Sequence, residues 1–291
     1  MSTRERRDRS DKADRDLSEL FLAAVAKHQI PINSVALAAV GGYGRGELSP
    51  GSDLDITIIH KAKNQKLDEF VSDFLYPLWS SGVQIDHSVR TPEELIEVAK
   101  TDIRVILGAL DIRFIAGNEE LSSEASEKIV KLWQTDYKKF LSDLHKSINE
   151  RSDRNGELAF LLEPDLKEAR GGLRDANTLR ALSLLGRERV PLEKISEAQV
   201  FLQNVRDSLH TAVTKPRDQL LLTEQDKVAE LMGFNNADEL MMMVAKSART
   251  IDYVTDSVWH SIEHKKKRFA LRKSIRLAAG VISEAGQINL E

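Results

Sequence analysis

The stretch that decides the fold of this chain reads GGYGRGELSPGSDLDITII over residues 41–59. It follows a short apolar run, residues 35–40, and ends in a second run, residues 54–59, that is rich in β-branched side chains. Both runs are typical of buried strands. A glycine-rich turn after a buried strand lets backbone N–H groups approach a polyphosphate without obstruction by Cβ atoms. The stretch therefore predicts two strands joined by a phosphate-binding turn.

Two common phosphate motifs do not fit this turn. In a P-loop, a lysine and a hydroxyl residue follow the glycines, whereas here Gly46 is followed by Glu47. The glycine spacing also differs from the G-x-G-x-x-G pattern of dinucleotide-binding folds. We therefore exclude a Walker-type ATPase and a Rossmann dehydrogenase.

Two aspartates follow the turn. Asp53 and Asp55 alternate with the apolar Leu54, so on a strand their carboxylates point to the same face. Two acids on one face repel each other unless a cation neutralises them, and proteins bind Mg²⁺ through one or two carboxylates together with substrate phosphates. Asp86, on a further predicted strand at residues 83–87, is placed to supply a third carboxylate. These residues predict metal-assisted nucleotidyl transfer, in which two metal ions stabilise an in-line displacement.

On both sides of residues 35–59, the spacing of the apolar residues predicts further helices and strands. Mixed Arg and Asp residues dominate positions 1–16, so we expect a solvated, disordered charged tail or a frayed first turn there. The elements expected next are helix 17–28, strands 35–40 and 54–59, helix 67–80, strand 83–87, a helix that starts at Thr91-Pro92-Glu93-Glu94, and long amphipathic helices at 124–145, 196–213 and 237–263. We predict an α+β fold, with a small mixed-sheet nucleotidyltransferase domain at 17–117 and an all-α helical domain at 118–291.

Composition narrows the class of protein. The 291 residues carry 42 Lys and Arg against 46 Asp and Glu, a net charge of −4, and they include no cysteine. Disulfide scaffolds, cysteine-ligated zinc and thiolate catalysis are therefore excluded. The negative charge disfavours a nucleic-acid partner, transfer to tRNA included. No run approaches the roughly 18 apolar residues of a membrane span, so we expect a cytoplasmic protein with no membrane partner.

Three separate motifs carry a resemblance to a known family. They are GGYGRGEL at 41–48 with SDLD at 52–55, HSVRT at 87–91, and LKEARGGLRD at 166–175. Together they resemble the bacterial PII-protein uridylyltransferase/uridylyl-removing enzymes, within the DNA polymerase β-type nucleotidyltransferase superfamily. The resemblance implies transfer of UMP or AMP from a nucleoside triphosphate to a tyrosine of the nitrogen-signalling protein PII, with release of pyrophosphate.

The same resemblance implies roles for nine residues. Asp53 and Asp55 are expected to hold Mg²⁺, while Asp86 ligates a second metal and helps to deprotonate the tyrosine. The implied nucleotide-binding residues are Gly41, Gly42, Arg45, Ser52, Lys167 and Arg174. Among these, the glycines and the serine are expected to contact the triphosphate, and the three cations to neutralise the leaving pyrophosphate.

The chain also departs from the family pattern. Some relatives carry an acid at the position of Gln84, and we take Asp86 as its replacement. Full-length members continue into a phosphohydrolase domain with a His-Asp motif and into ACT domains that sense glutamine. No His-Asp dipeptide occurs here, so we expect this chain to lack the removing activity and glutamine sensing. No residue decides between UTP and ATP as the donor.

Several alternatives remain open. Transfer to a small molecule or to another protein uses the same aspartates, although a small-molecule acceptor gives no reason for the 166–175 motif. A non-catalytic nucleotide-binding regulatory module is a second alternative, and the three acids argue against it. At single positions, Arg45 has Glu47 or Glu19 as an alternative partner, and Asp86 has Arg90. Lys167 and Arg174 are equally explained by a basic loop at a helix start.

Overall fold

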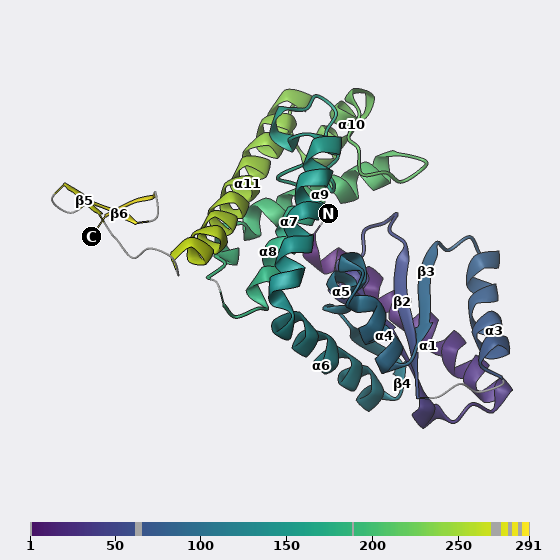
Figure 1. Cartoon of the computed structure of the whole chain (residues 1–291). Coiled ribbons are helices and arrows are strands. Elements are labelled where there is room, and N and C mark those ends of the chain that lie inside the picture. Colours follow the sequence, from purple (N-terminus) through teal and green to yellow (C-terminus); the bar gives the residue numbers. More distant parts are fainter. Residues whose placement is uncertain are drawn as a thin grey trace.

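The computed structural model describes residues 2–61, 66–187, 189–268, 275–278, 281–284 and 287–290. It shows an α+β fold built on a mixed four-stranded sheet in the order β3-β2-β1-β4 (Figure 1). The strands are β1 (Val35–Ala39), β2 (Leu54–His60), β3 (Ile85–Arg90) and β4 (Arg113–Gly117). Strand β1 is antiparallel to both of its neighbours, whereas β2 and β3 run parallel. The predicted small mixed sheet is confirmed, and the glycine-rich turn joins its two central strands.

Helices α1 (Thr3–His28) and α3 (Leu67–Ser80) cover one face of this sheet. Phe21 of α1 meets Phe70 and Phe74 of α3 edge-on, with ring centroids 5.4 and 5.5 Å apart. All three rings are fully buried, and each such burial contributes about 1.5–3 kcal/mol. This packing holds β2 in place, and the two predicted metal-binding aspartates lie at the start of that strand. Helix α3 has the predicted bounds.

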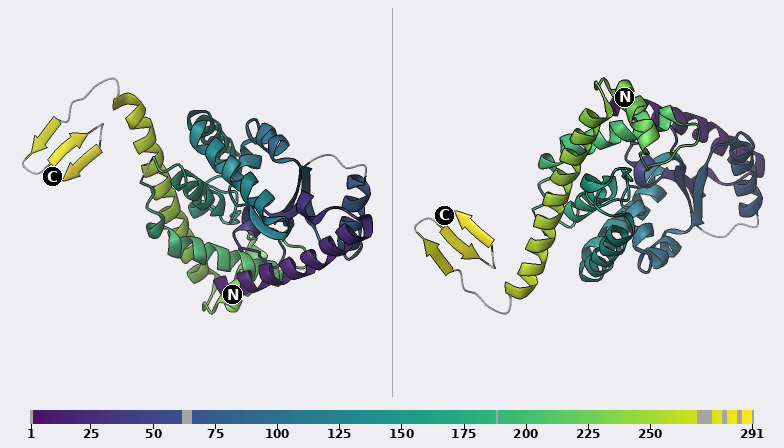
Figure 2. Two further views of the ribbon diagram at one scale, coloured as in Figure 1. Left: turned by 90° about the horizontal axis from the view of Figure 1, so that it is seen from below. Right: turned by 90° about the horizontal axis from the view of Figure 1, so that it is seen from above.

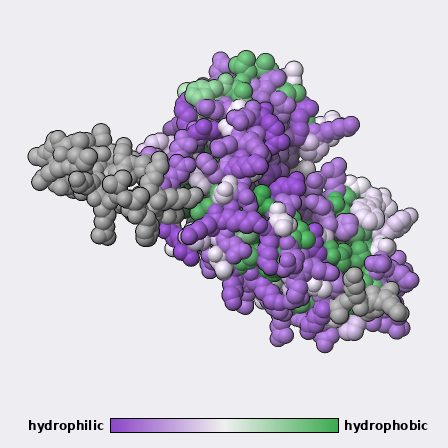
Figure 3. Space-filling view, in the orientation of Figure 1, coloured by the Kyte–Doolittle hydropathy of each residue, from purple (hydrophilic) through white to green (hydrophobic). Residues whose placement is uncertain are grey.

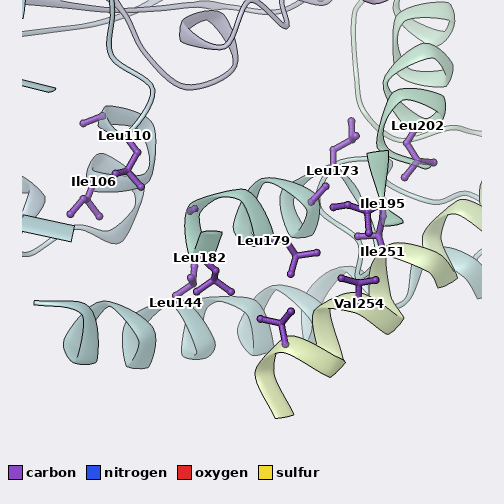
Figure 4. Close-up of a cluster of buried hydrophobic side chains, with 14 of the residues drawn as sticks. Ile106, Leu110, Leu144, Leu173, Leu179, Leu182, Ile195, Leu202, Ile251 and Val254 are labelled. Carbon is purple, nitrogen blue, oxygen red and sulfur yellow. The ribbon is translucent and has the colours of Figure 1, made fainter. Parts of the chain in front are cut away.

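The opposite face of the sheet continues into the helical part of the chain. The remaining helices are α2 (Gly41–Gly44), α4 (Pro92–Ala99), α5 (Ile103–Ala109), α6 (Glu119–Thr135), α7 (Tyr137–Asn155), α8 (Leu173–Ser183), α9 (Ser196–Ala212), α10 (Leu222–Met232) and α11 (Ala237–Arg268), with 3₁₀ turns at Ile32–Ser34, Leu158–Phe160 and Leu192–Lys194. Buried side chains from α5, α7, α8, α9 and α11 meet in one core (Figure 4). Ala36, Ala38 and Ile59 of the sheet belong to the same core. The division at residue 117 therefore stays a prediction, because the apolar core does not break there.

The charged N-terminal segment is helical, which corrects the prediction of a solvated tail over residues 1–16. Helix α1 begins one residue after Ser2, whose hydroxyl caps it. Arg6 is only 1% exposed, and its guanidinium pairs with Asp207 of α9 at 2.9 Å. The charge pattern could not reveal this, because the partner of Arg6 lies 201 residues away. In two further views, α1 runs from the helical part to the sheet (Figure 2).

Two other elements differ from the predictions. Strand β4 was not predicted, because its five residues include a charged and a glycine end and only Ala116 is buried. The helix expected over 124–145 is divided at Asp136 into α6 and α7.

The capping box predicted at Thr91 is confirmed: its hydroxyl accepts from the Glu94 N–H at 3.1 Å, and the Glu94 carboxylate accepts from the Thr91 N–H at 2.9 Å.

The C-terminal segment contains strands, so the prediction of an all-α region over 118–291 is wrong at its end. Strands β5 (Ile275–Ala278), β6 (Val281–Glu284) and β7 (Gln287–Leu290) pair antiparallel in that order and lie apart from the helices (Figure 2). Each gap between them is two residues long in the sequence, and two-residue connections are the commonest between antiparallel strands, a spacing that the helical prediction overlooked. Among the described residues, no helix is long and apolar enough to cross a membrane.

Candidate active site

A cavity of about 910 Å³ is lined by residues of both the sheet region and the helical part. All nine residues predicted for the site line it: Gly41, Gly42, Arg45, Ser52, Asp53, Asp55, Asp86, Lys167 and Arg174. They come from the turn after β1, the start of β2, strand β3, the segment before α8, and α8 itself. The fold thus brings together residues that the sequence separates by up to 133 positions.

The three predicted acids lie at the end of the sheet where β2 and β3 begin. Asp55 is the register partner of Asp86 across the parallel pair, and Asp53 immediately precedes β2. Burial, and next the neighbouring Asp86 carboxylate, raise the pKa of Asp55 above its usual value; Asp53 acts in the same direction. Lys167 and Arg45 oppose this shift. The carboxylates are therefore close enough to repel one another, which favours binding of a cation.

The acids do not form a closed metal cage. Within the part of the chain that the structure describes, no three acid or imidazole side chains are arranged to hold an ion by themselves. This open arrangement fits Mg²⁺, which keeps several waters and is held by one or two carboxylates plus substrate phosphates. The same arrangement is less suited to a structural ion such as zinc, because structural zinc takes four protein ligands. Asp53 and Asp55, with Asp86 across the strand pair, would supply carboxylates to Mg²⁺ only together with substrate phosphates.

The glycine-rich turn leaves room beside Asp55. Gly41 has φ +57°, a left-handed conformation that favours glycine. A Cβ atom added at Gly41 would lie 3.5 Å from Oδ2 of Asp55. At Gly44 a Cβ would overlap the backbone carbonyl of Asp111, so this position also requires glycine. The turn can therefore pass close to both the Asp55 carboxylate and the backbone at Asp111.

The three predicted cations already have acidic partners. Arg45 donates from Nε to Glu47 at 2.7 Å and from Nη1 to Asp111 at 2.6 Å, so the alternative partner considered for it is present. Arg174 donates from Nε to both carboxylate oxygens of Glu168 at 2.9 Å. Lys167 lies 3.7 Å from Asp218 and is 41% exposed. Each cation therefore supplies positive charge at the cavity wall, and hydrogen bonds to an acid fix the orientation of Arg45 and Arg174.

Sequence reasoning missed a second group of cavity residues on α9 and the segment after it. Arg206 donates from Nε to Asp218 at 2.6 Å, and His210 Nε2 lies 3.0 Å from the same carboxylate oxygen. Although burial opposes the shift, the hydrogen bond with His210 and the charge of Arg206 lower the pKa of Asp218. A signal was available: Gln203, Arg206 and His210 are spaced i, i+3 and i+7, which places them on one helix face.

Arg180 of α8 is another cation that the motifs did not reveal. It contacts Asp111, which also pairs with Arg45. Burial, followed by the charge of Arg45, lowers the pKa of Arg180 to about 10. Asp111 thus holds two arginines at the wall of the cavity.

The cavity is more positive than the rest of the chain. Its lining includes nine Lys and Arg residues against seven Asp and Glu residues, whereas the whole chain has a net charge of −4. The face of the molecule seen in Figure 3 is mostly hydrophilic, so compared with this face the cavity is distinguished by the sign of its charge rather than by polarity. An excess of cations around a pair of acids is suited to an anionic ligand that arrives with a divalent metal.

The 166–175 motif is largely a structural turn. Gly171 has φ +81°, and a Cβ there would lie 2.6 Å from the carbonyl oxygen of Ala248 on α11. Asp175 is fully buried; it accepts from the Gly171 N–H at 2.7 Å and pairs with Arg151. These contacts close the turn against α11. Lys167 and Arg174 remain at the cavity wall.

Comparison with known proteins identifies the two parts of the chain. The family described as "Nucleotidyltransferase domain" matches residues 21–131, and the family described as "GlnD PII-uridylyltransferase" matches residues 139–259. The chain carries a nucleotidyltransferase domain and is a relative of the PII uridylyltransferases. The first match contains the acids and the glycine-rich turn, and the second contains the 166–175 motif and α9.

Three bacterial relatives are named bifunctional uridylyltransferase/uridylyl-removing enzyme. The protein of Streptomyces coelicolor is 42% identical over 272 residues, covering 93% of this chain and 32% of the relative. That of Mycobacterium tuberculosis is 33% identical over 88% of this chain and 33% of the relative. That of Corynebacterium glutamicum is 32% identical over 94% of this chain and 40% of the relative. The chain thus spans roughly a third of the length of these uridylyltransferases and matches their nucleotidyltransferase part.

Proposed function

We propose that this chain catalyses Mg²⁺-dependent transfer of a nucleoside monophosphate from UTP or ATP to a tyrosine hydroxyl of a PII protein. Pyrophosphate is the second product. The observation that carries this proposal is the meeting of nine motif residues, from five segments, around one cavity with three adjacent carboxylates. The likeness to uridylyltransferases supports the choice of PII as acceptor.

The acids and the cations of the cavity have different roles in this transfer. Asp53 and Asp55 would hold Mg²⁺, which would supply polarisation of the α-phosphate and charge stabilisation at the attacking and leaving oxygens. The exposed Asp86 accepts the proton of the tyrosine hydroxyl as that oxygen attacks the α-phosphorus. Arg45 and Lys167 stabilise the charge that develops on pyrophosphate as the bond to the α-phosphorus breaks.

Asp86 is the acid best placed for the proton transfer. It lies on the edge strand β3 and is exposed, whereas its register partner Asp55 is half-buried. A base on an exposed edge can reach a hydroxyl on a second protein. Gln84, the position at which some relatives have an acid, also lines the cavity, but its amide cannot accept a proton at neutral pH.

The direct test is incubation of the purified chain with a PII protein, Mg²⁺ and either UTP or ATP, followed by measurement of the intact mass of the PII subunit. A gain of one UMP or AMP is expected, and it identifies the donor. A PII variant with phenylalanine in place of the acceptor tyrosine is the control and should gain no mass. Absence of any gain with both donors, while Mg²⁺-nucleotide still binds, would contradict the proposal and favour another acceptor or a regulatory module.

A further inference from the structure

Helix α9 contacts the segment that leads to the metal-binding aspartates. We propose that Arg206, Asp207 and His210 act as positioning residues that hold residues 48–52, and through them Asp53, in the geometry needed to bind Mg²⁺-nucleotide. This inference rests on the proposed function for its catalytic consequence. The contacts themselves link parts of the chain about 150 residues apart, and no motif of the sequence points to them.

Arg206 provides the first point of attachment. Its Nη1 donates to the hydroxyl of Ser49 at 2.8 Å and to that of Ser52 at 3.3 Å. Its Nε is held by Asp218 at 2.6 Å, which fixes the plane of the guanidinium. Ser49 is only 3% exposed, so water cannot readily replace Arg206 as its partner. The segment is therefore attached to α9 on both sides of Gly51.

His210 provides the second point of attachment, and its tautomer follows from its two partners. The backbone N–H of Gly51 donates to Nδ1 at 3.3 Å, so this nitrogen carries no proton. Nε2 therefore carries the proton and donates it to Asp218 at 3.0 Å. The His210 side chain is 2% exposed, which confines the ring to this orientation.

Asp207 provides a third, indirect attachment. This fully buried carboxylate pairs with Arg6 at 2.9 Å and with Arg9 at 3.2 Å, both on α1. The Nε of Arg9 donates to the carbonyl oxygen of Leu48 at 2.9 Å. The N-terminal turns of α1, predicted to be a solvated tail, thus connect α9 to the beginning of the same segment.

The fit between the segment and the helical part is close. A Cβ added at Gly51 would lie 2.2 Å from two ring carbons of Pro216 and 3.2 Å from Nδ1 of His210. Gly51 is two residues from Asp53, so a shift of this contact moves a metal-binding carboxylate. Displacement of about 1 Å is sufficient to cost roughly a hundredfold in rate when catalytic geometry is disturbed. Correct placement of Asp53 therefore requires α9 as well as the sheet.

Two conservative variants of His210 separate its two hydrogen bonds. In His210→Asn, the side-chain oxygen takes the place of Nδ1 and still accepts from Gly51, but the contact with Asp218 is lost. In His210→Gln, the amide nitrogen takes the place of Nε2 and still donates to Asp218, but the contact with Gly51 is lost. His145→Gln is the matched control, because His145 is 42% exposed on α7 and does not line the cavity.

The expected result is a difference between the two variants. His210→Gln should show faster hydrogen exchange at the amides of residues 48–53, about a tenfold higher KM for Mg²⁺-nucleotide and a lower kcat, with the KM for PII unchanged. His210→Asn should retain most of the amide protection and most of the activity. A global loss of stability would instead raise hydrogen exchange throughout the chain. It would not raise the KM for Mg²⁺-nucleotide while leaving the KM for PII unchanged.

The proposal is overturned if both variants show wild-type protection of residues 48–53, or if they lose it to the same extent. Hydrogen exchange needs no turnover, so it tests the positioning contacts even if the wild-type chain transfers no nucleotide to PII. In that case the proposed function fails, but a difference in protection between the variants still supports the positioning contacts.

Discussion

Asp55 on β2 and Asp86 on β3 are register partners across the parallel pair of strands. Burial, and next the Asp86 carboxylate, raise the pKa of Asp55. Such an arrangement costs free energy in the absence of a ligand. Under the proposed function, a cation that binds there together with an anionic substrate would offset this cost.

Replacement of either metal-binding acid should abolish most of the transfer. Asp55→Asn and Asp53→Asn are expected to lower turnover by about a thousandfold or more, because a neutral amide binds Mg²⁺ poorly and places the triphosphate less well. Initial rates with PII at saturating Mg²⁺-nucleotide measure the effect. Asp68→Asn, an exposed change in the first turn of α3, is the control. Near-normal turnover of the Asp55 variant would show that the metal assignment is wrong.

The raised pKa of Asp55 also predicts how pH affects stability. Because its pKa in the folded state lies above the ordinary value of 3.8, the folded state binds a proton more readily than the unfolded chain. Stability therefore falls as the pH rises through the interval between these two values. Without metal, Asp55→Asn should be more stable than the wild type at pH 7, and the difference should shrink as the pH approaches 3.8. Thermal unfolding of both proteins in a chelator measures this, and a difference that grows on acidification contradicts it.

The sequence predicted the parts of the site that are encoded locally. The Asp53–Asp55 pair and the glycine turn lie within 15 residues, so strand alternation and the glycine-rich turn after a buried strand were sufficient to recognise them. Asp86 followed from a second strand of recognisable pattern. The resemblance then supplied Lys167 and Arg174, which no local rule connects to the acids.

The parts that depend on distant partners could not be predicted in this way. Arg6 belongs to a segment with the composition of a solvated tail, and only its burial against Asp207 shows its structural role. Arg206 and His210 lie on a polar helix face that would ordinarily be exposed to solvent. Their importance depends on the docking of Gly51 against α9, which is a tertiary contact.

Loss of the Asp218 carboxylate should destabilise the chain near neutral pH. This acid accepts from Arg206 and His210 and lies near Lys167, so Asp218→Asn leaves buried donors poorly paired, at a cost of about 2 kcal/mol. Since its pKa is lowered in the folded state, its contribution is present above the ordinary value of 3.8 and is lost as the pH falls through the folded value. Urea unfolding at pH 7 and pH 3 should show a difference from the wild type that narrows on acidification. An equal difference at both pH values would exclude a role for the charge.

A methyl group at Gly51 should disturb the contact with the helical part. The added Cβ of Gly51→Ala meets the rigid ring of Pro216 at 2.2 Å, and overpacking of this kind costs about 1–3 kcal/mol. Gly108→Ala on α5 is the matched control for stability, because its Cβ meets no atom within 4 Å and alanine favours a helix by about 1 kcal/mol over glycine. Urea unfolding should therefore show opposite signs for the two changes. Pro216→Gly combined with Gly51→Ala should recover much of the loss, since the double variant removes the clashing ring; if the two changes are simply additive, the segment does not dock against Pro216 as described.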